Sequence, residues 1–152
     1  MPPPSPSTAP LDRLYREVDS LTAELDRIHA GRLQCRLGCS SCCLDGLTVF
    51  AVEAENIRRH HASLLATGPA HPGGACAFLD EEGACQIYEH RPYVCRTQGY
   101  PLRWMEERGD GSAVEMRDIC PLNDPGPAVE ALPPRSCWTL GPMETKLAGI
   151  QS

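Results

Sequence analysis

Nine cysteines constrain this chain of 152 residues more than any other feature of its sequence. Four of them fall within nine consecutive residues, and the full set is Cys35, Cys39, Cys42, Cys43, Cys76, Cys85, Cys95, Cys120 and Cys137. Thiolates are strong ligands for soft and borderline metals, and the C-x-x-C spacing of Cys39 and Cys42 lets one turn offer two sulfurs to one ion. We therefore predict a domain built around a metal centre.

A disulfide framework is the alternative use of so many thiols, and the sequence argues against it. The first ten residues have neither the basic region nor the apolar region of a secretory signal, so we expect a cytoplasmic protein with reduced thiols. An odd number of cysteines also fits complete pairing poorly. No stretch approaches the roughly 18 apolar residues of a membrane span, so we expect no membrane association.

The composition predicts a small fold with many turns. The chain has 13 Gly and 15 Pro but only two Phe, two Trp and four Tyr, so it supplies little large apolar volume. A chain of this kind gains from a metal staple. We predict a small α+β single domain, mostly helix and loop, stapled by metal. The formal charge of −6 argues against nucleic acid as a partner, because phosphate binding needs a basic face.

Four segments follow from local patterns. Residues 1–9 are a Pro/Ser-rich lead-in that we expect to be disordered. Residues 10–31 predict an amphipathic helix, because apolar residues recur in steps of three and four. These are Leu11, Leu14, Val18, Leu21, Leu25 and Ile28. Residues 32–122 form the cysteine-rich metal-binding segment, and 123–152 a Pro-rich loop with a short C-terminal helix over 142–150. The first helix docks on its own domain or pairs two chains, and fewer than three heptads favours docking.

Within the cysteine-rich segment we expect three further elements. We predict a second helix over residues 51–65. Glu53 and Glu55 lie near its start, where negative charge interacts favourably with the helix dipole. We predict a short helix over residues 86–91 that ends before Pro92. A second helix then begins with Pro92 in its first turn. Residues 100–107 and 112–118 predict a β-hairpin, because an Asp-Gly turn joins them.

Cys42 and Cys43 are adjacent, which limits how they can bind metal. Neighbouring side chains diverge in both helices and strands, so the two thiolates rarely serve one tetrahedral ion. They reach two metals, or different irons of one cluster, or one of them is a spare thiol. The sequence lacks the second C-x-x-C pair that is usual in zinc sites, whereas its Cys120-Pro121 dipeptide is typical of ferredoxins. The ligands predict an iron–sulfur cluster or zinc, and we favour iron.

The cysteine spacings resemble a known family. The segments that carry the likeness are Cys35 to Cys43, Cys76-Ala-Phe-Leu79 and Gly83-Ala-Cys85-Gln-Ile-Tyr88-Glu-His-Arg91-Pro92-Tyr-Val-Cys95-Arg96. Together they resemble the YkgJ-like cysteine-cluster family, the zinc- or iron-chelating domain of the CxxCxxCC type, over residues 35–121. The first gap here, Cys35 to Cys39, is one residue longer than the family pattern. The resemblance implies a small metal-binding domain, a module that is also attached to enzymes such as flagellin lysine methylases.

By motif match the resemblance implies a ligand set of Cys39, Cys42, Cys43, Cys76, Cys85 and Cys95, followed by Cys35 and Cys120. Cys137 lies outside it and is either a buried side chain or a further ligand. Among the other residues, His60 and His61 are expected to be solvated or capping, and His90 is a candidate to orient or ligate. Arg91 and Arg96 either neutralise thiolates by hydrogen bonding to sulfur, which their position between motif cysteines favours, or are simply surface charges.

Three functions are consistent with these observations. The first is a metal-binding module that presents itself to a protein partner or stores metal. The second is a redox or metal-dependent enzyme, similar to iron–sulfur oxidoreductases, or an electron-transfer partner. The third is a zinc-stapled adaptor that docks through residues 10–31, including a homodimer through that helix. No Ser/His/Asp arrangement or nucleotide fingerprint is recognisable, so we assign no catalytic residue and leave enzymatic activity open.

Overall fold

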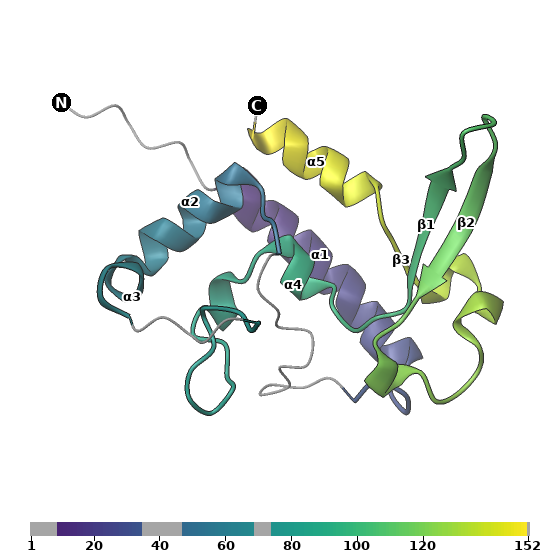
Figure 1. The fold of residues 1–152 in the computed structure, drawn as a ribbon, viewed down its shortest axis with the longest axis horizontal. Helices are drawn as coiled ribbons and strands as arrows, with labels where there is room; N and C mark the ends of the chain where they lie inside the picture. Colours follow the sequence, from purple (N-terminus) through teal and green to yellow (C-terminus); the bar gives the residue numbers. More distant parts are fainter. Residues whose placement is uncertain (1–8, 35–46, 69–73, 152) are drawn as a thin grey trace.

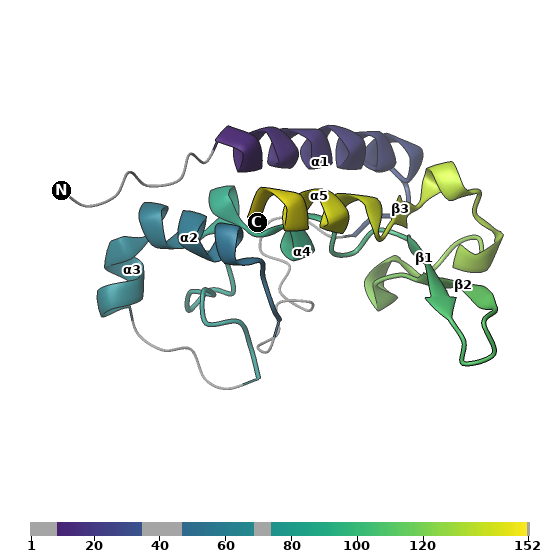
Figure 2. The ribbon, with the colours of Figure 1, turned by 90° about the horizontal axis from the view of Figure 1, so that it is seen from above.

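A long N-terminal helix runs along the molecule, and the C-terminal helix lies beside it (Figure 1, Figure 2). The structure, a computed structural model, describes residues 9–34, 47–68 and 74–151. Its helices are α1 (Ala9–Ile28), α2 (Ala51–His60), α3 (Ala62–Thr67), α4 (Tyr93–Arg96) and α5 (Pro142–Gln151). Its strands are β1 (Leu102–Glu107), β2 (Ala113–Asp118) and β3 (Trp138–Thr139). This arrangement confirms the predicted small α+β fold, whereas the metal staple stays a prediction.

Some predictions fall on parts of the chain that the structure does not describe. Cys35, Cys39, Cys42 and Cys43 lie outside the described residues, and so do residues 1–8 of the expected lead-in. Ala9, which we assigned to the lead-in, is the first residue of α1.

Helix α1 docks on its own chain, as predicted. Its buried face packs with the aromatic and aliphatic side chains of α4, β3 and α5 to form the hydrophobic core (Figure 2). The core residues are Leu11, Leu14, Tyr15, Val18, Leu25, Tyr93, Trp138, Met143 and Leu147. Two residues of the predicted stripe, Leu21 and Ile28, are 47% and 43% exposed. An α-helix turns by about 20° per seven residues relative to a strict heptad, so a face centred on Leu11 and Val18 turns away from them.

The hairpin forms as predicted, and a third short strand extends it. Strands β1 and β2 pair antiparallel from Leu102↔Asp118 to Glu107↔Ala113. The turn contains Gly111 at φ +87°, a conformation that favours glycine. Strand β3 pairs parallel with β1, which gives the order β2-β1-β3. The hairpin and the α2–α3 pair lie at opposite ends of the molecule (Figure 1).

Three predicted segments differ from the structure. The helix expected over 51–65 is interrupted at His61, whose backbone leaves the helical region (φ −131°, ψ 35°). The helix expected over 86–91 is a single 3₁₀ turn, η1 (Tyr88–His90), and Pro92 is the N-cap of α4 rather than its first residue. The Pro-rich loop expected from residue 123 onward contains the 3₁₀ turns η3 (Val129–Ala131) and η4 (Pro134–Ser136), and a third 3₁₀ turn, η2 (Pro121–Asn123), lies at its start.

Candidate metal centre

Cys76 and Cys85 lie at the two ends of a tight loop. Cys85 forms an antiparallel bridge with Leu79, and the backbone N–H of Leu79 donates to the carbonyl of Cys76 at 3.2 Å. The Asp80 carboxylate closes the loop by accepting from two backbone N–H groups at 2.9 Å. Gly83, at φ +80°, supplies the turn. The local sequence therefore brings two half-buried predicted ligands into one small unit.

The Cys85 thiol is electrostatically linked to Cys76. Burial raises the pKa of Cys85, a backbone hydrogen bond at Ile87 lowers it, the charge of Cys76 raises it and the Arg91 guanidinium lowers it. The two thiolates would therefore repel each other. A bound cation would remove that repulsion, because metal ligation requires the deprotonated thiolate.

Cys95 lies on the four-residue helix α4, between two tethered residues. The backbone N–H of Tyr93 donates to Glu53 Oε2 at 2.5 Å. Arg96 Nη1 donates to the Asp19 carboxylate on α1, with a shortest distance of 2.9 Å. The only turn of α4 is thus fixed from both sides of Cys95.

Arg91 and Arg96 have oxygen rather than sulfur partners in the contacts of the described chain. Arg96 is buried, and it also donates to the carbonyls of Arg91 and Glu89 at 2.8 and 3.2 Å. Arg91 lies over the Tyr88 ring at 4.1 Å and donates to the Tyr88 carbonyl. The charge of Arg91 also lowers the pKa of a predicted ligand, Cys85. That the two guanidinium groups neutralise thiolates stays a prediction.

Asn123 joins three segments that each border a predicted ligand. Its side chain is fully buried. Asn123 Oδ1 accepts from the backbone N–H of Gln34 at 2.6 Å, and Nδ2 donates to the carbonyl of Gly99 at 2.8 Å. Its own backbone N–H donates to the Cys120 carbonyl at 2.8 Å. Sequence reasoning missed this residue, because no local pattern distinguishes it from other loop asparagines.

The segment that carries the four-cysteine cluster is held at both of its described ends. On one side Gln34 is bonded to Asn123, three residues after Cys120. On the other side the backbone N–H of Phe50 donates to Glu53 Oε1 at 3.3 Å, and the same carboxylate bonds α4. The described residue before the cluster, Gln34, is therefore tied to the turn at Cys120, and Phe50 after the cluster is tied through Glu53 to α4.

The described residues alone do not complete a metal site. Within residues 9–34, 47–68 and 74–151, no three His, Cys, Asp or Glu side chains converge to hold an ion. Cys76, Cys85, Cys120 and Cys137 are nevertheless free thiols rather than disulfides. Their donor chemistry fits zinc or iron. Which of the eight predicted cysteines bind metal stays a prediction.

Cys137 is a buried residue of the fold. It is 7% exposed, and Arg117 Nη1 donates to its Sγ at 3.3 Å. The same nitrogen donates to the carbonyl of Leu132 at 2.7 Å. Burial raises the pKa of the Cys137 thiol, and Arg117 partly offsets this. These contacts account for Cys137 as a packing residue.

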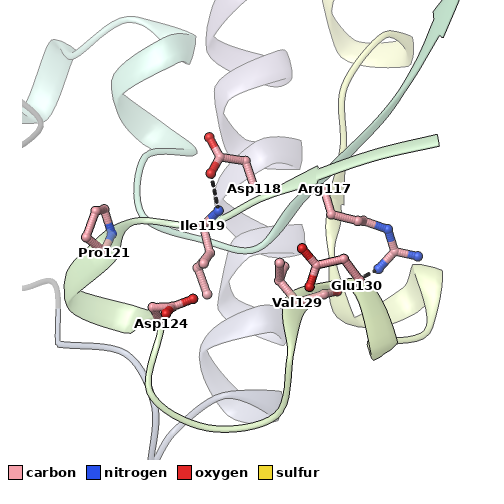
Figure 3. Close-up of a pocket in the computed structure, with 7 residues that line it drawn as sticks. All are labelled: Arg117, Asp118, Ile119, Pro121, Asp124, Val129 and Glu130. Atoms are coloured by element: carbon pink, nitrogen blue, oxygen red, sulfur yellow. Dashed lines mark hydrogen bonds between the residues drawn. The ribbon is translucent and has the colours of Figure 1, made fainter. Parts of the chain in front are cut away.

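An open cavity of about 280 Å³ is lined by Ile119 and Pro121, the residues on either side of Cys120 in the sequence (Figure 3). Three carboxylates and one guanidinium are among its lining residues, which are Arg117, Asp118, Ile119, Pro121, Asp124, Val129 and Glu130. One of the three carboxylates already has a hydrogen-bond partner within the protein, because Asp118 accepts from the backbone N–H of Ile119 at 2.8 Å. The cavity adds acidic surface beside a predicted ligand.

His60, His61 and His90 form a cluster that sequence reasoning did not anticipate. His60 stacks on His90 with ring centroids 4.0 Å apart, and His61 Nε2 lies 2.9 Å from His90 Nδ1. One nitrogen of that pair must accept, so at least one of the two rings is neutral. Burial, followed by the charges of His60 and His61, lowers the pKa of His90. In these contacts His90 orients other imidazoles rather than a thiolate.

One comparison with known proteins finds a match. A family model named CxxCxxCC and described as "Putative zinc- or iron-chelating domain" matches residues 34–121. The matched region contains all eight predicted ligands and excludes Cys137. No curated protein and no solved structure matches the chain. In the part of the chain that the structure describes, no helix is long and apolar enough to cross a membrane.

Proposed function

The chain belongs to the CxxCxxCC family of zinc- or iron-chelating domains, and we propose that it holds an iron–sulfur cluster or zinc through clustered cysteine thiolates, with iron favoured. The family match over residues 34–121 carries this proposal, because it spans every cysteine of the predicted ligand set. The residues that would hold the metal are Cys35, Cys39, Cys42, Cys43, Cys76, Cys85, Cys95 and Cys120.

The ties described above support a single centre. Asn123 connects the residue before Cys35 with the turn after Cys120, and Glu53 connects the chain beyond Cys43 with α4, which carries Cys95. The segment between these ties, from Cys35 to Val49, has 15 residues. Long loops that are closed by a metal gain stability, because the closure entropy is lost from the unfolded chain.

The chain's own groups set the conditions for binding. A bound metal would supply positive charge that keeps several neighbouring thiols deprotonated. Burial and the proximity of Cys76 oppose deprotonation of Cys85, whereas Arg91 favours it. Metal affinity should therefore fall as the pH is lowered. Iron is favoured because two adjacent cysteines serve different irons of a cluster more readily than one tetrahedral ion.

The test is metal analysis with an optical spectrum on protein that is purified without oxygen, with iron and zinc both supplied. We expect stoichiometric metal, and a brown sample that bleaches on reduction if the centre is an iron–sulfur cluster. A colourless, zinc-loaded protein would exclude the electron-transfer function and would be consistent with the zinc-stapled adaptor. Cys85→Ser should lower the metal content, and Cys137→Ala is the matched control that should not. Metal below one equivalent, with unchanged folding in chelator, would overturn the proposal.

A further inference from the structure

We propose that Glu53 is a positioning residue for the metal centre: its buried carboxylate fixes the first turn of α4 and thereby orients the Cys95 thiol. This inference rests on the proposed function. Glu53 itself would not touch the metal, and it acts through the backbone of the helix that carries the ligand.

The burial of Glu53 calls for an explanation. Its exposed fraction is 1%, although it lies on the short helix α2 whose next acidic residue, Glu55, contacts Arg58 at the surface. Burying a carboxylate is strongly unfavourable unless hydrogen bonds replace its water. A role at the start of α2 requires only the bond from Phe50 to Oε1. The second oxygen, Oε2, is not needed at the start of α2 and accepts hydrogen bonds from other segments.

Oε2 joins α1 and α4 to α2. It accepts from the Tyr15 hydroxyl at 2.6 Å and from the backbone N–H of Tyr93 at 2.5 Å. That N–H belongs to the first residue of α4, where a helix has no internal partner for its donors. A carboxylate is the strongest acceptor available for it. Glu53 therefore holds the helix end that lies two residues before Cys95.

The other side of Cys95 is held independently. Arg96 follows Cys95 directly, binds the Asp19 carboxylate and lies over the Tyr15 ring at 3.9 Å. Tyr15 thus contacts both groups that restrain α4, and it lies within electrostatic range of the Cys95 thiol. With only four residues, α4 has little intrinsic stability. The direction of the Cys95 side chain depends on these outside contacts.

Loss of such an outer contact weakens metal binding by roughly 10- to 100-fold in characterised metal sites. We expect Glu53→Gln to weaken Zn²⁺ binding by roughly tenfold, near the low end of that range, because the Arg96 tether stays in place. Glu55→Gln is the matched control: it is the same substitution on the same helix, at a residue whose side chain is 42% exposed and pairs with Arg58.

The experiment uses the full chain loaded with Zn²⁺ and measures withdrawal of the ion by a competing chelator. Cys95→Ser and the double variant Glu53→Gln/Cys95→Ser complete a double-mutant cycle. If Glu53 acts through Cys95, its substitution has no further effect once the Cys95 thiol is gone. Loading with Co²⁺ gives a second readout, because the thiolate-to-metal absorption of Glu53→Gln should resemble that of Cys95→Ser.

Three outcomes would overturn the inference. These are wild-type affinity in Glu53→Gln, an equal loss of affinity with and without the Cys95 thiol, and an equal loss in Glu55→Gln. Should Glu53→Gln fail to fold, Glu53→Asp keeps the charge but shortens the side chain by one methylene and withdraws the carboxylate from the Tyr93 N–H; wild-type affinity in that variant would overturn the inference as well. A wild-type chain that binds no Zn²⁺, Co²⁺ or iron would instead refute the proposed function.

Discussion

Replacing Asn123 by alanine should destabilise the fold more than any other single change of a loop side chain discussed above. The substitution leaves the backbone of η2 intact, including the bond from the N–H of residue 123 to the Cys120 carbonyl. It removes the side-chain atoms that accept from Gln34 and donate to Gly99. Two backbone groups from different parts of the chain then lose their partner.

The magnitude follows from the burial of those groups. The Gly99 carbonyl is in a buried bond, and an unsatisfied buried acceptor costs about 1–3 kcal/mol. The Gln34 N–H is only partly buried, so water replaces part of its bond and the loss is about 0.5–1.5 kcal/mol. We expect a total loss of roughly 2–4 kcal/mol in the free energy of unfolding, a large fraction of the 5–15 kcal/mol typical of a domain.

Urea unfolding followed by circular dichroism measures this loss. With a slope of about 2 kcal/mol per molar urea, the midpoint should fall by roughly 1–2 M. Metal content is measured in the same samples, because a bound metal adds to stability through its own affinity. Asn56→Ala is the control, since Asn56 is also buried but its Oδ1 has no hydrogen-bond partner in the described structure. A loss below about 0.5 kcal/mol, or one no larger than in the control, would refute the reasoning.

Three further predictions address the histidine cluster, Cys137 and α1. Lowering the pH from 7 to 5 should reduce the melting temperature more in the wild type than in His90→Asn. Burial and two neighbouring imidazoles lower the pKa of His90, so the folded state binds fewer protons than the unfolded state. The free energy of unfolding therefore falls as the pH falls through the ordinary histidine range. Cys137→Ala should cost about 1 kcal/mol, because Arg117 loses one acceptor, and should leave metal content unchanged; reduced metal would contradict the packing role. Leu14→Ala should cost about 2–5 kcal/mol in urea unfolding. Leu21→Ala on the exposed side should cost under about 1 kcal/mol, and equal losses would show that α1 docks differently.

Features that depend on neighbouring residues were predictable from the sequence. The spacing of apolar residues predicted α1, and the Asp-Gly turn predicted the hairpin of β1 and β2. The number and spacing of the cysteines predicted the family, which the match over residues 34–121 confirms. Each of these signals lies within a few turns of chain or in the linear order of residues, so no knowledge of the folded shape is needed to see it.

Features that depend on distant residues were not predictable. Strand β3 has two residues and exists only because β1 lies beside it. Leu21 belongs to the apolar pattern but is exposed, because the direction from which α4 and α5 pack decides which face of α1 is buried. Sequence reasoning treated Glu53 as a helix-start acid, whereas its carboxylate bridges three segments.

The sequence by itself determined which metals this protein suits, because clustered cysteines with C-x-x-C spacing offer the sulfur ligands that zinc and iron prefer. Only the tertiary structure decided which polar groups fix the segments that carry the predicted ligands. Asn123 and Glu53 act through hydrogen bonds between residues that are 24 to 89 positions apart. Such bonds form only after the hydrophobic core has brought the partners together, so their identity is a property of the packed molecule.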